Sequence, residues 1–505
     1  MTQKNTPYDI AIIGGGINGA GIARDASGQG LKTLLLEADD LGQATSSAST
    51  KLIHGGLRYL EYYEFSLVRK ALKERETLLE LAPHIIWPLE FILPHNAGMR
   101  PKWMIRAGLW LYDNLARRKH LPGSRAVRLD DEDVYGRPLA GHLKNGFSYS
   151  DCWVEDSRLV LLNALDASER GADIRLHERC QEIKALDNSH WSIKSEKGDY
   201  EARMLVNATG PWVDQFLDSA GPEQESPRQQ SIRLVKGSHI VVPKIYEGDH
   251  CYTLQLPDGR AMFVIPYEKN YTLIGTTEEA FRDDPGKAGI SDEEISYMCR
   301  FVSENFKTRL DTDDVIWTYS GVRPLLEDTT KNDEKNASKV TRDYRLVKTF
   351  VDDAPLVSVY GGKITTYRVL AQDVMFQFGH KTSWTANAPL PGGDIPDADF
   401  DTFLSGVVER YDFLDPRTVK RLARQFGTRI KDVLGPAKAL SDLGEHYGDD
   451  IYEAEIRYFV KQEWARTVDD ILYRRTKLGL HITPRTKKRI EQALKSLLSE
   501  SVSAQ

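Results

Sequence analysis

Cysteine is scarce in this chain, with four residues in 505, namely Cys152, Cys180, Cys251 and Cys299. No two of them form a Cys-x-x-Cys pair, and their spacing fits no zinc site, so we expect no bound metal. Free cysteine often behaves as a small core residue, and such use is typical of a reducing compartment. The cysteines therefore predict buried, reduced thiols in a cytoplasmic protein.

Long hydrophobic runs are also missing. No stretch reaches the roughly 18 uninterrupted apolar residues that a membrane-spanning helix needs, and the opening residues MTQKNTPYDI contain no apolar segment of a signal peptide. A net charge of −7 argues against nucleic-acid binding by bulk electrostatics. Neither the G-x-S-x-G elbow of hydrolases nor the H-E-x-x-H zinc motif occurs. We therefore expect a protein that does not cross a membrane, although it can lie on one.

The first forty residues carry a βαβ pattern around a glycine-rich turn. Residues 8–13 are a short apolar strand, residues 17–29 have the small side chains of a closely packed helix, and residues 31–36 form a second strand. Gly14-x-Gly16-x-x-Gly19 joins strand to helix, and Glu37 ends the second strand. In dinucleotide folds such glycines permit a tight turn, close approach of a pyrophosphate and close helix packing, while the carboxylate accepts hydrogen bonds from a ribose. This order predicts a Rossmann-type cofactor site.

The glycine pattern alone does not distinguish NAD from FAD, but two further segments favour FAD. Residues 45–56, TSSASTKLIHGG, offer hydroxyl groups and close backbone approach beside the pyrophosphate, and residues 357–363 are a strand that ends in a double glycine. The fingerprint also lies near the N-terminus, as in many FAD enzymes. The residues expected to contact FAD are Gly14, Gly15, Gly16, Asn18, Gly19, Glu37, Ala38, Thr45, Ser46, Ser47, Lys51, Leu52, His54, Gly55, Gly56, Ala208, Thr209, Gly210, Gly362, Lys363, Thr365 and Thr366.

Several longer motifs together resemble the FAD-dependent glycerol-3-phosphate dehydrogenases. They are IIGGGINGAGIARDAS, TSSASTKLIHGGLRYLE, NATGPW, KGSHIVVP, TYSGVRPL and GGKITTYR, followed by SDLGEHYG and EAEIRYFVKQEWARTVDDILYRRTKLGL. The resemblance runs from about residue 8 to the end. It implies a flavin fold with a helical C-terminal cap, oxidation of sn-glycerol 3-phosphate to dihydroxyacetone phosphate by hydride transfer from C2 to FAD, and electron transfer to a membrane quinone.

A phosphorylated polyol needs cations for its phosphate and a group that accepts the hydroxyl proton. Arginine suits phosphate because its planar guanidinium binds two oxygens at once, although most of the 67 Lys and Arg residues are expected to be surface charges. A histidine in an alternating strand is often structural, but the resemblance places this strand beside the flavin, and imidazole transfers protons near neutral pH. Which residue takes the proton stays open. The expected catalytic residues are His239, Arg323, Lys363 and Arg58, and the expected substrate contacts are Arg58, Tyr59, Thr276, Arg323 and Arg342.

Residues 99–119 predict a basic amphipathic helix. Trp103, Ala107, Trp110, Leu111 and Leu115 recur at helical spacing, six Lys or Arg residues flank them, and the segment holds a single acidic residue. Such a helix suits the surface of an anionic bilayer, whereas a core-facing helix with a solvated rim is the alternative. The membrane interpretation is favoured, because a quinone must be reached from the lipid. It places the protein peripherally on the inner face of the cell membrane.

The order of elements predicts an α/β (α+β) protein with interleaved domains. We expect residues 1–390 to combine a Rossmann-type FAD-binding domain, mainly 8–80, 150–215 and 350–375, with a β-sheet substrate domain, mainly 81–149 and 216–349. Residues 391–505 follow the Pro-Gly-rich segment 389–393 and read as a helical cap, which could pair two subunits in a homodimer.

Two alternatives remain beside the quinone-linked dehydrogenase. A soluble oxidase on the same fold would pass electrons to oxygen and yield hydrogen peroxide, because a fold does not decide the acceptor. A flavin-binding sensor would hold the cofactor without turnover. The basic helix favours the dehydrogenase over the oxidase, and the arginines together with His239 argue against the sensor.

Overall fold

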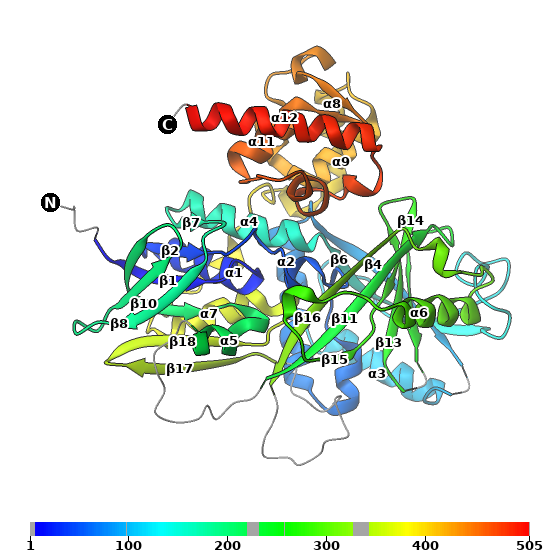
Figure 1. The fold of residues 1–505 in the computed structure, drawn as a ribbon. Coiled ribbons are helices and arrows are strands. Elements are labelled where there is room, and N and C mark those ends of the chain that lie inside the picture. The colour runs from blue at the N-terminus through cyan, green and yellow to red at the C-terminus, as the bar shows by residue number, and fades with distance from the viewer. Residues whose placement is uncertain (1–5, 97, 220–231, 257, 327–342, 504–505) are drawn as a thin grey trace.

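The computed structural model describes residues 6–96, 98–219, 232–256, 258–326 and 343–503. Within these residues the chain forms two large β-sheets that lie side by side, and a helical unit lies over them (Figure 1). This arrangement confirms the expected fold class, a Rossmann-type sheet joined to a second sheet and a helical C-terminal part.

The first sheet has eight strands in the described part of the chain, and its centre is parallel. The order β17-β18-β10-β1-β2-β7 places the first strand in the middle, where its apolar side chains are fully buried. The carboxyl ends of β1, β10 and β18 therefore meet at one edge, which is where dinucleotides bind in such folds. The strands are β1 (Tyr8–Ile13), β2 (Thr33–Leu36), β7 (Asp173–Arg175), β8 (Cys180–Ala185), β9 (Trp191–Ser195), β10 (Asp199–Asn207), β17 (Arg345–Val351) and β18 (Ala354–Tyr360).

Helix α1 (Ile17–Gly28) follows β1 and packs against α4 (Asp156–Glu169) and α7 (Tyr367–Gln377). Its small residues allow this close contact, since a Cβ added at Gly21 would lie 2.7 Å from the ring of Tyr367. The same helix donates a hydrogen bond from Arg24 Nε to Asp166 Oδ2 on α4, at 2.6 Å. Helix α1 is thus held in place by α4 and by α7.

The second sheet is mainly antiparallel, with the order β15-β11-β14-β13-β12-β4-β6-β3 and with β16 and β5 paired at its sides. A long pairing joins β11 to β16 and sets His239 opposite Tyr319 and Val235 opposite Arg323. The strands are β3 (Leu52–Ile53), β4 (Ile86–His95), β5 (Arg125–Arg128), β6 (Asn145–Val154), β11 (Ile232–Pro243), β12 (Cys251–Gln255), β13 (Ala261–Tyr267), β14 (Tyr271–Gly275), β15 (Glu279–Phe281) and β16 (Trp317–Leu326). Strands β3 and β6 bring the loop after β2 into this sheet.

Four further helices precede the C-terminal part in the described residues, and one of them carries the tryptophans of the basic segment. They are α2 (Phe65–Leu81), α3 (Lys102–Asn114), α5 (Val213–Ser219) and α6 (Asp292–Asn305). On α3, Trp103 and Trp110 are 69% and 61% exposed, whereas Leu109 and Tyr112 are buried in the core. The core-facing interpretation of the tryptophans is therefore wrong. Leu115, which the sequence placed on the same stripe, instead packs against the core beside Leu109.

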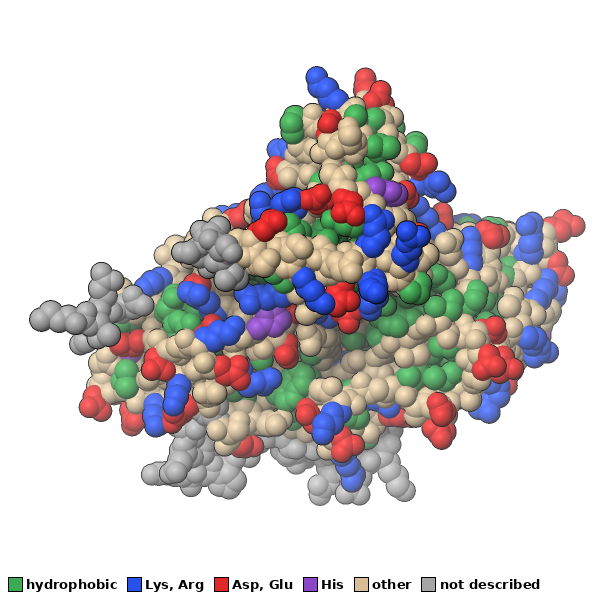
Figure 2. Space-filling view, turned by 45° about the horizontal axis from the view of Figure 1, so that its top comes forward, with side chains coloured by type: hydrophobic (Ala, Val, Ile, Leu, Met, Phe, Trp, Pro, Cys, Tyr) green, Lys and Arg blue, Asp and Glu red, His purple; other side chains and the backbone are tan. Residues whose placement is uncertain are grey.

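The C-terminal part is helical and has a hydrophobic core of its own, built from residues between Val407 and Leu497. Its helices are α8 (Phe400–Arg410), α9 (Pro416–Phe426), α10 (Ile430–Leu434), α11 (Glu453–Gln462) and α12 (Pro484–Ser503), with a short hairpin of β19 (His446–Gly448) and β20 (Ile451–Tyr452). On the face that carries this unit, cationic and anionic side chains are interspersed (Figure 2).

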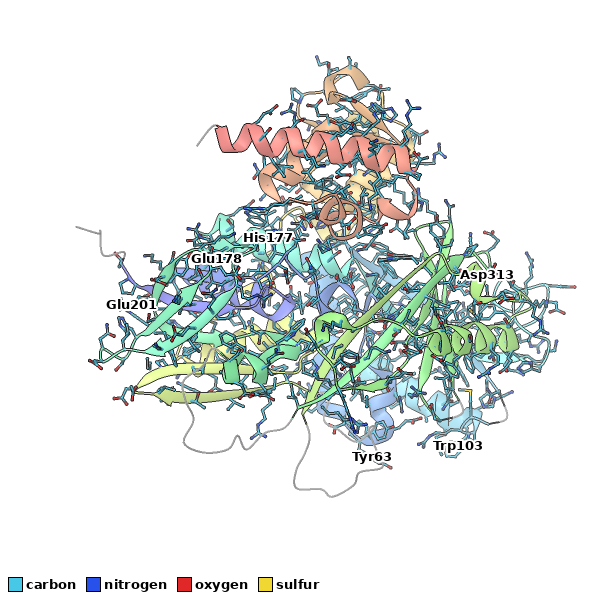
Figure 3. The ribbon with its side chains drawn as sticks, in the orientation of Figure 1. Tyr63, Trp103, His177, Glu178, Glu201 and Asp313 are labelled. Carbon is cyan, nitrogen blue, oxygen red and sulfur yellow. The ribbon has the colours of Figure 1, made fainter. Side chains whose placement is uncertain are left out.

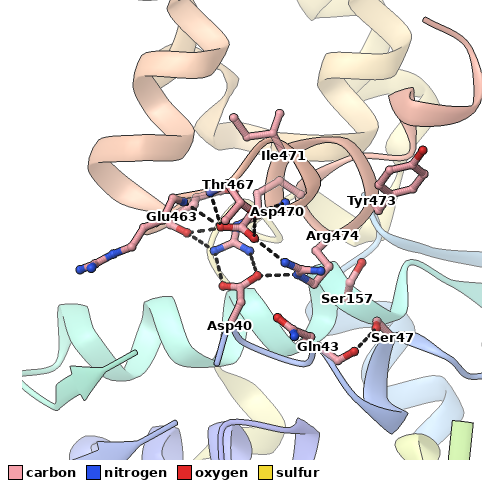
Figure 4. A network of polar contacts seen from close by, with 12 residues as sticks. Asp40, Gln43, Ser47, Ser157, Glu463, Thr467, Asp470, Ile471, Tyr473 and Arg474 are labelled. Carbon is pink, nitrogen blue, oxygen red and sulfur yellow. Dashed lines mark hydrogen bonds and ion pairs between the residues drawn. The ribbon is translucent and has the colours of Figure 1, made fainter. Parts of the chain in front are cut away.

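A buried ion network fastens the helical unit to the cofactor-binding sheet (Figure 4). Asp40, just beyond β2, accepts hydrogen bonds from Arg474 Nε at 2.6 Å and from Arg475 Nη2 at 2.9 Å. Arg158 on α4 pairs with Glu463 at 2.6 Å in the same region. Because these groups are almost entirely buried, loss of one partner would leave an uncompensated charge, at a cost of about 3–5 kcal/mol.

Candidate active site

The glycine-rich turn after β1 has the close approaches that the sequence predicts. Gly14 has φ of +108°, and a Cβ there would lie 2.6 Å from the carbonyl oxygen of Ala208. A Cβ at Gly19 would lie 1.8 Å from Gly14 O, so only glycine lets α1 start this close to the strand. Ser46 Oγ accepts a hydrogen bond from Ile17 N at 3.0 Å and holds the loop 45–56 over the start of the helix.

Glu37 lies at the end of β2 beside the same turn. Its carboxylate accepts hydrogen bonds from Gly15 N at 2.6 Å and Asp39 N at 2.9 Å. Burial raises the pKa of Glu37, while these two backbone donors act in the opposite direction. A carboxylate fixed here can accept a ribose hydroxyl and would repel a 2′-phosphate. Ala38 directly follows it.

The turn at the end of β18 completes the candidate cofactor site, which we call the cradle and which also includes the turn after β1 and the end of β2. Gly361 and Gly362 have φ of +72° and +109°, and Asn18 Nδ2 donates to Gly361 O at 3.2 Å. The other amide atom, Asn18 Oδ1, is buried and has no hydrogen-bond partner among the described residues. Glycines that leave room for a ligand and an unpaired polar atom at the helix start fit the pyrophosphate of FAD.

Both side chains and backbone groups fix the loop after β2. Thr45 Oγ1 donates to Val322 O at 2.7 Å, and His54 N donates to Thr365 Oγ1 at 3.3 Å. Lys51 is fully buried, and its ammonium donates to Asp156 Oδ1 at 2.7 Å and to Ser47 O at 3.2 Å. Of the predicted contacts from this loop, Thr45 thus lies against β16 and His54 against the residues after β18. The others lie elsewhere: Ser46 against the start of α1, Ser47 and Lys51 against each other and Lys51 against α4, Leu52 against β6, Gly55 against α2 and α3, and Gly56 against Tyr59.

Three further predicted contacts follow β10, where Ala208 N donates to Ile13 O at 2.9 Å and ties the segment to β1. After β18, Thr365 and Thr366 are buried at the start of α7. The ammonium of Lys363 lies 3.8 Å from the ring centre of Tyr59, so these two predicted residues are in contact. The structure brings together the predicted cofactor residues from β1, β2, β10 and β18, including Ala208, Thr209 and Gly210.

His239 lies in the middle of β11 and is almost fully buried. Its Nε2 lies 3.0 Å from Thr50 Oγ1, whereas Nδ1 is buried without a hydrogen-bond partner among the described residues. Burial, together with the positive charges of Lys51 and Arg323, lowers the pKa of His239 well below its ordinary value. The imidazole is therefore neutral at pH 7 and can accept a proton.

Arg323 and Thr276 meet two residues away from His239. A Cβ placed on Gly237 would lie 2.7 Å from both Arg323 Nη2 and Thr276 Oγ1. Arg323 also pairs with Glu278 at 3.5 Å, and its side chain is 37% exposed. A cation and a hydroxyl thus meet at Gly237, and the neutral imidazole of His239 lies two residues further along β11. A phosphorylated alcohol needs this combination of groups.

Two predicted substrate residues remain, Arg58 and Arg342. Arg58 is half-buried in the short helix Leu57–Tyr62, and Arg58 Nη2 donates to Tyr62 Oη at 3.3 Å. Arg342 lies outside the residues that the structure describes.

Three residues near the site escaped the sequence reasoning. Thr50 contacts His239, Tyr319 stacks on its ring, and Asp156 holds Lys51. Thr50 and Tyr319 lie inside the motifs TSSAST and TYSGVRPL, so their place in these motifs could have identified them as site residues. Nothing in the local sequence pairs Asp156 with a lysine 105 residues earlier.

Comparisons with known proteins find relatives of this chain over nearly its whole length. The family of FAD dependent oxidoreductases matches residues 9–343, and the C-terminal domain of alpha-glycerophosphate oxidase matches residues 383–501. A glycerol-3-phosphate dehydrogenase of Pseudomonas aeruginosa is 46% identical over 98% of both chains, and a D-erythritol 1-phosphate dehydrogenase of Brucella abortus is 47% identical over 96% of both. The crystal structure of the Bacillus halodurans glycerol-3-phosphate dehydrogenase with FAD has a TM-score of 0.71 at 26% identity, and covers 98% of this chain and 95% of that one.

Fold and cradle therefore define an FAD-dependent oxidoreductase, and FAD is its cofactor. Within that class, the chain belongs to the glycerol-3-phosphate dehydrogenase family, which it matches over nearly its whole length.

Proposed function

We propose that this protein oxidises sn-glycerol 3-phosphate to dihydroxyacetone phosphate and passes the electrons to a membrane quinone. The substrate assignment rests on the meeting of Arg323 and Thr276 at Gly237, two residues along β11 from His239. His239 in turn contacts Thr50 in the loop that borders the cofactor site. The names of the P. aeruginosa and B. halodurans relatives support the same substrate.

In this proposal the guanidinium of Arg323 binds the substrate phosphate, and Thr276 positions a substrate oxygen. The free Nδ1 of His239 accepts the proton of the C2 hydroxyl, so that the C2–O bond becomes a carbonyl. When bound, FAD supplies the acceptor for the hydride that leaves C2. Burial, with the positive charges of Lys51 and Arg323, lowers the pKa of His239 and keeps its imidazole neutral before the reaction.

A four-carbon polyol phosphate is the second candidate substrate. The B. abortus relative named for D-erythritol 1-phosphate is as similar to this chain as the P. aeruginosa enzyme. Both substrates share a phosphate and a neighbouring secondary alcohol, so the groups around Gly237 serve either one.

Kinetics on the purified holoenzyme decide between them. We expect kcat/KM with a soluble dye acceptor to be higher for sn-glycerol 3-phosphate than for D-erythritol 1-phosphate. The reverse order would make the four-carbon compound the substrate, and no oxidation of either would overturn the proposal.

The membrane contact is assigned to the end of the molecule opposite α12. Tyr63 and Trp103 project there (Figure 3), and they are 80% and 69% exposed. Indole and phenol rings favour the headgroup zone of a bilayer. Among the described residues, no helix is both long and apolar enough to span a membrane. We therefore propose peripheral attachment to the inner face of the cell membrane.

The replacement of both Trp103 and Trp110 by Glu tests this attachment. The variant should fold, because both side chains are exposed, and should reduce a soluble dye normally. It should lose flotation with liposomes and reduce a membrane quinone poorly. Equal flotation of wild type and variant would place the contact elsewhere, and rapid oxygen uptake without quinone would favour an oxidase.

A further inference from the structure

A basic hollow of about 680 Å³ lies between α2 and the turn that follows α3. Arg69, Lys73, Arg117 and Arg118 line it, together with the single carboxylate of Asp113. These side chains give the hollow a net charge of +3. On the face in Figure 2, by contrast, both signs are interspersed.

The carboxylate in the hollow is already satisfied. Asp113 Oδ2 accepts from Ser124 N at 2.8 Å and from Ser124 Oγ at 2.7 Å, and Oδ1 accepts from Arg118 Nη1 at 3.3 Å. Arg69, Lys73 and Arg117 are exposed and have no ion-pair partner among the described residues. Arg69 and Lys73 are four residues apart on α2, so their side chains share one face of that helix. Three uncompensated cations therefore face one concavity.

The hollow also continues the exposed aromatic stripe of α3. Trp103, Ala107, Trp110 and Asn114 follow each other at spacings of three or four residues and are all exposed. Asn114, the last residue of α3, also lines the hollow, and the exposed Arg117 lines it from the turn after the helix. Indole rings favour the headgroup zone, so cations beside the end of this stripe lie at the level of the lipid phosphates.

We propose that this hollow binds the phosphate headgroup of an anionic phospholipid. The inference rests on the proposed membrane attachment and deepens it. The tryptophans supply attachment to any bilayer, whereas the hollow supplies the preference for anionic lipid. Free phosphate offers the same anionic oxygens as a lipid headgroup, but the position of the hollow beside the tryptophans favours the lipid.

The test compares two double variants of the holoenzyme that each remove two positive charges. Lys73→Gln with Arg117→Gln removes them from the hollow, and Arg485→Gln with Lys488→Gln removes them from exposed positions on α12, at the opposite end of the molecule (Figure 1). Partition is measured on phosphatidylcholine vesicles with and without phosphatidylglycerol. The hollow variant should bind the phosphatidylglycerol vesicles about thirtyfold more weakly, since each cation near the surface contributes about 1 kcal/mol.

The same hollow variant should bind pure phosphatidylcholine vesicles like the wild type, and the α12 variant should match the wild type on both. Equal losses in the two variants would mean that total charge matters and would overturn the site. A hollow variant that binds like the wild type would also overturn it. Inorganic phosphate, added at constant ionic strength, should not release the protein. Release would mean that the hollow holds free phosphate rather than lipid.

The tryptophan variant separates this inference from the attachment itself. If Trp103→Glu with Trp110→Glu loses binding to both kinds of vesicle while the hollow variant loses none, attachment stands and the hollow site is wrong. If the wild type binds neither vesicle, both proposals fail.

Discussion

The imidazole of His239 stacks against the phenol ring of Tyr319, with the ring centres 4.7 Å apart and the planes inclined by 17°. Tyr319 is itself fixed, because its hydroxyl donates to Ser49 O at 2.9 Å. The neighbouring Thr50 holds Nε2 of the same imidazole. A residue that accepts a proton must keep its geometry, and these contacts hold the ring from the strand β16 and from the loop after β2.

Replacement of His239 by Gln should lower kcat by about 10²–10⁴-fold, because the C2 hydroxyl then lacks its proton acceptor. KM should change little, since the phosphate contact remains. Steady-state kinetics with a dye acceptor provide the measurement, and the exposed His142→Gln is the matched control. A change in KM alone would assign His239 to binding and not to proton transfer.

Replacement of Arg323 by Ala should raise KM for glycerol 3-phosphate about thirty- to a thousand-fold, which corresponds to about 2–4 kcal/mol for a lost charged hydrogen bond. The flavin content of the purified protein should stay the same. Arg345→Ala, at an exposed position on β17, should leave KM unchanged. Unaltered kinetics of Arg323→Ala would show that the phosphate lies elsewhere.

Replacement of Gly16 by Val should abolish FAD binding. A Cβ there would already lie 3.1 Å from Ser46 Oγ, and the larger side chain would occupy the space for the pyrophosphate. Flavin released by denaturation measures the effect. Gly108→Ala is the control, because a Cβ at that position on α3 meets nothing within 4 Å. A Gly16→Val protein with full flavin content would contradict the proposed cradle.

The cofactor cradle was predictable from sequence to a large extent, because it depends on short-range patterns. Gly14, Gly19 and Glu37 lie within one βαβ unit, and the structure places them as the spacing indicates. The surroundings of His239 depend instead on long-range pairing, since Thr50 lies 189 residues away in the chain.

Amphipathic periodicity likewise predicted helix α3 but could not say which side faces solvent. In the structure the side with Leu109 packs against the second sheet, and the side with Trp103 faces solvent. This choice depends on tertiary packing and not on the spacing of apolar residues.

Stability should fall in acid because of His84, whose ring is fully buried with both nitrogens unpaired among the described residues. Burial, with the charges of Arg158 and Arg424, lowers the pKa of His84 to about 3. In the unfolded state the pKa of this histidine is near 6.5, so between pH 3 and pH 6.5 the unfolded state binds more protons than the folded state. The contribution of His84 is therefore fully present above about pH 6.5 and is lost as the pH falls toward 3.

Between pH 7 and pH 5 this residue should cost about 2 kcal/mol of unfolding free energy. His84→Leu should remove that part of the loss, whereas the exposed His142→Leu should not. Denaturant unfolding of the holoenzyme at the two pH values measures the difference. The same loss in all three proteins would show that His84 does not titrate on unfolding.

Anaerobic titration of the yellow holoenzyme with sn-glycerol 3-phosphate tests the central claim most directly. If the site around His239 and Arg323 passes a hydride to the cofactor, the flavin absorbance should bleach without any added acceptor and return when a quinone is added. His239→Gln should bleach about 10²–10⁴-fold more slowly with the same flavin content. A wild-type protein that holds FAD but keeps its full absorbance with saturating glycerol 3-phosphate would contradict the account.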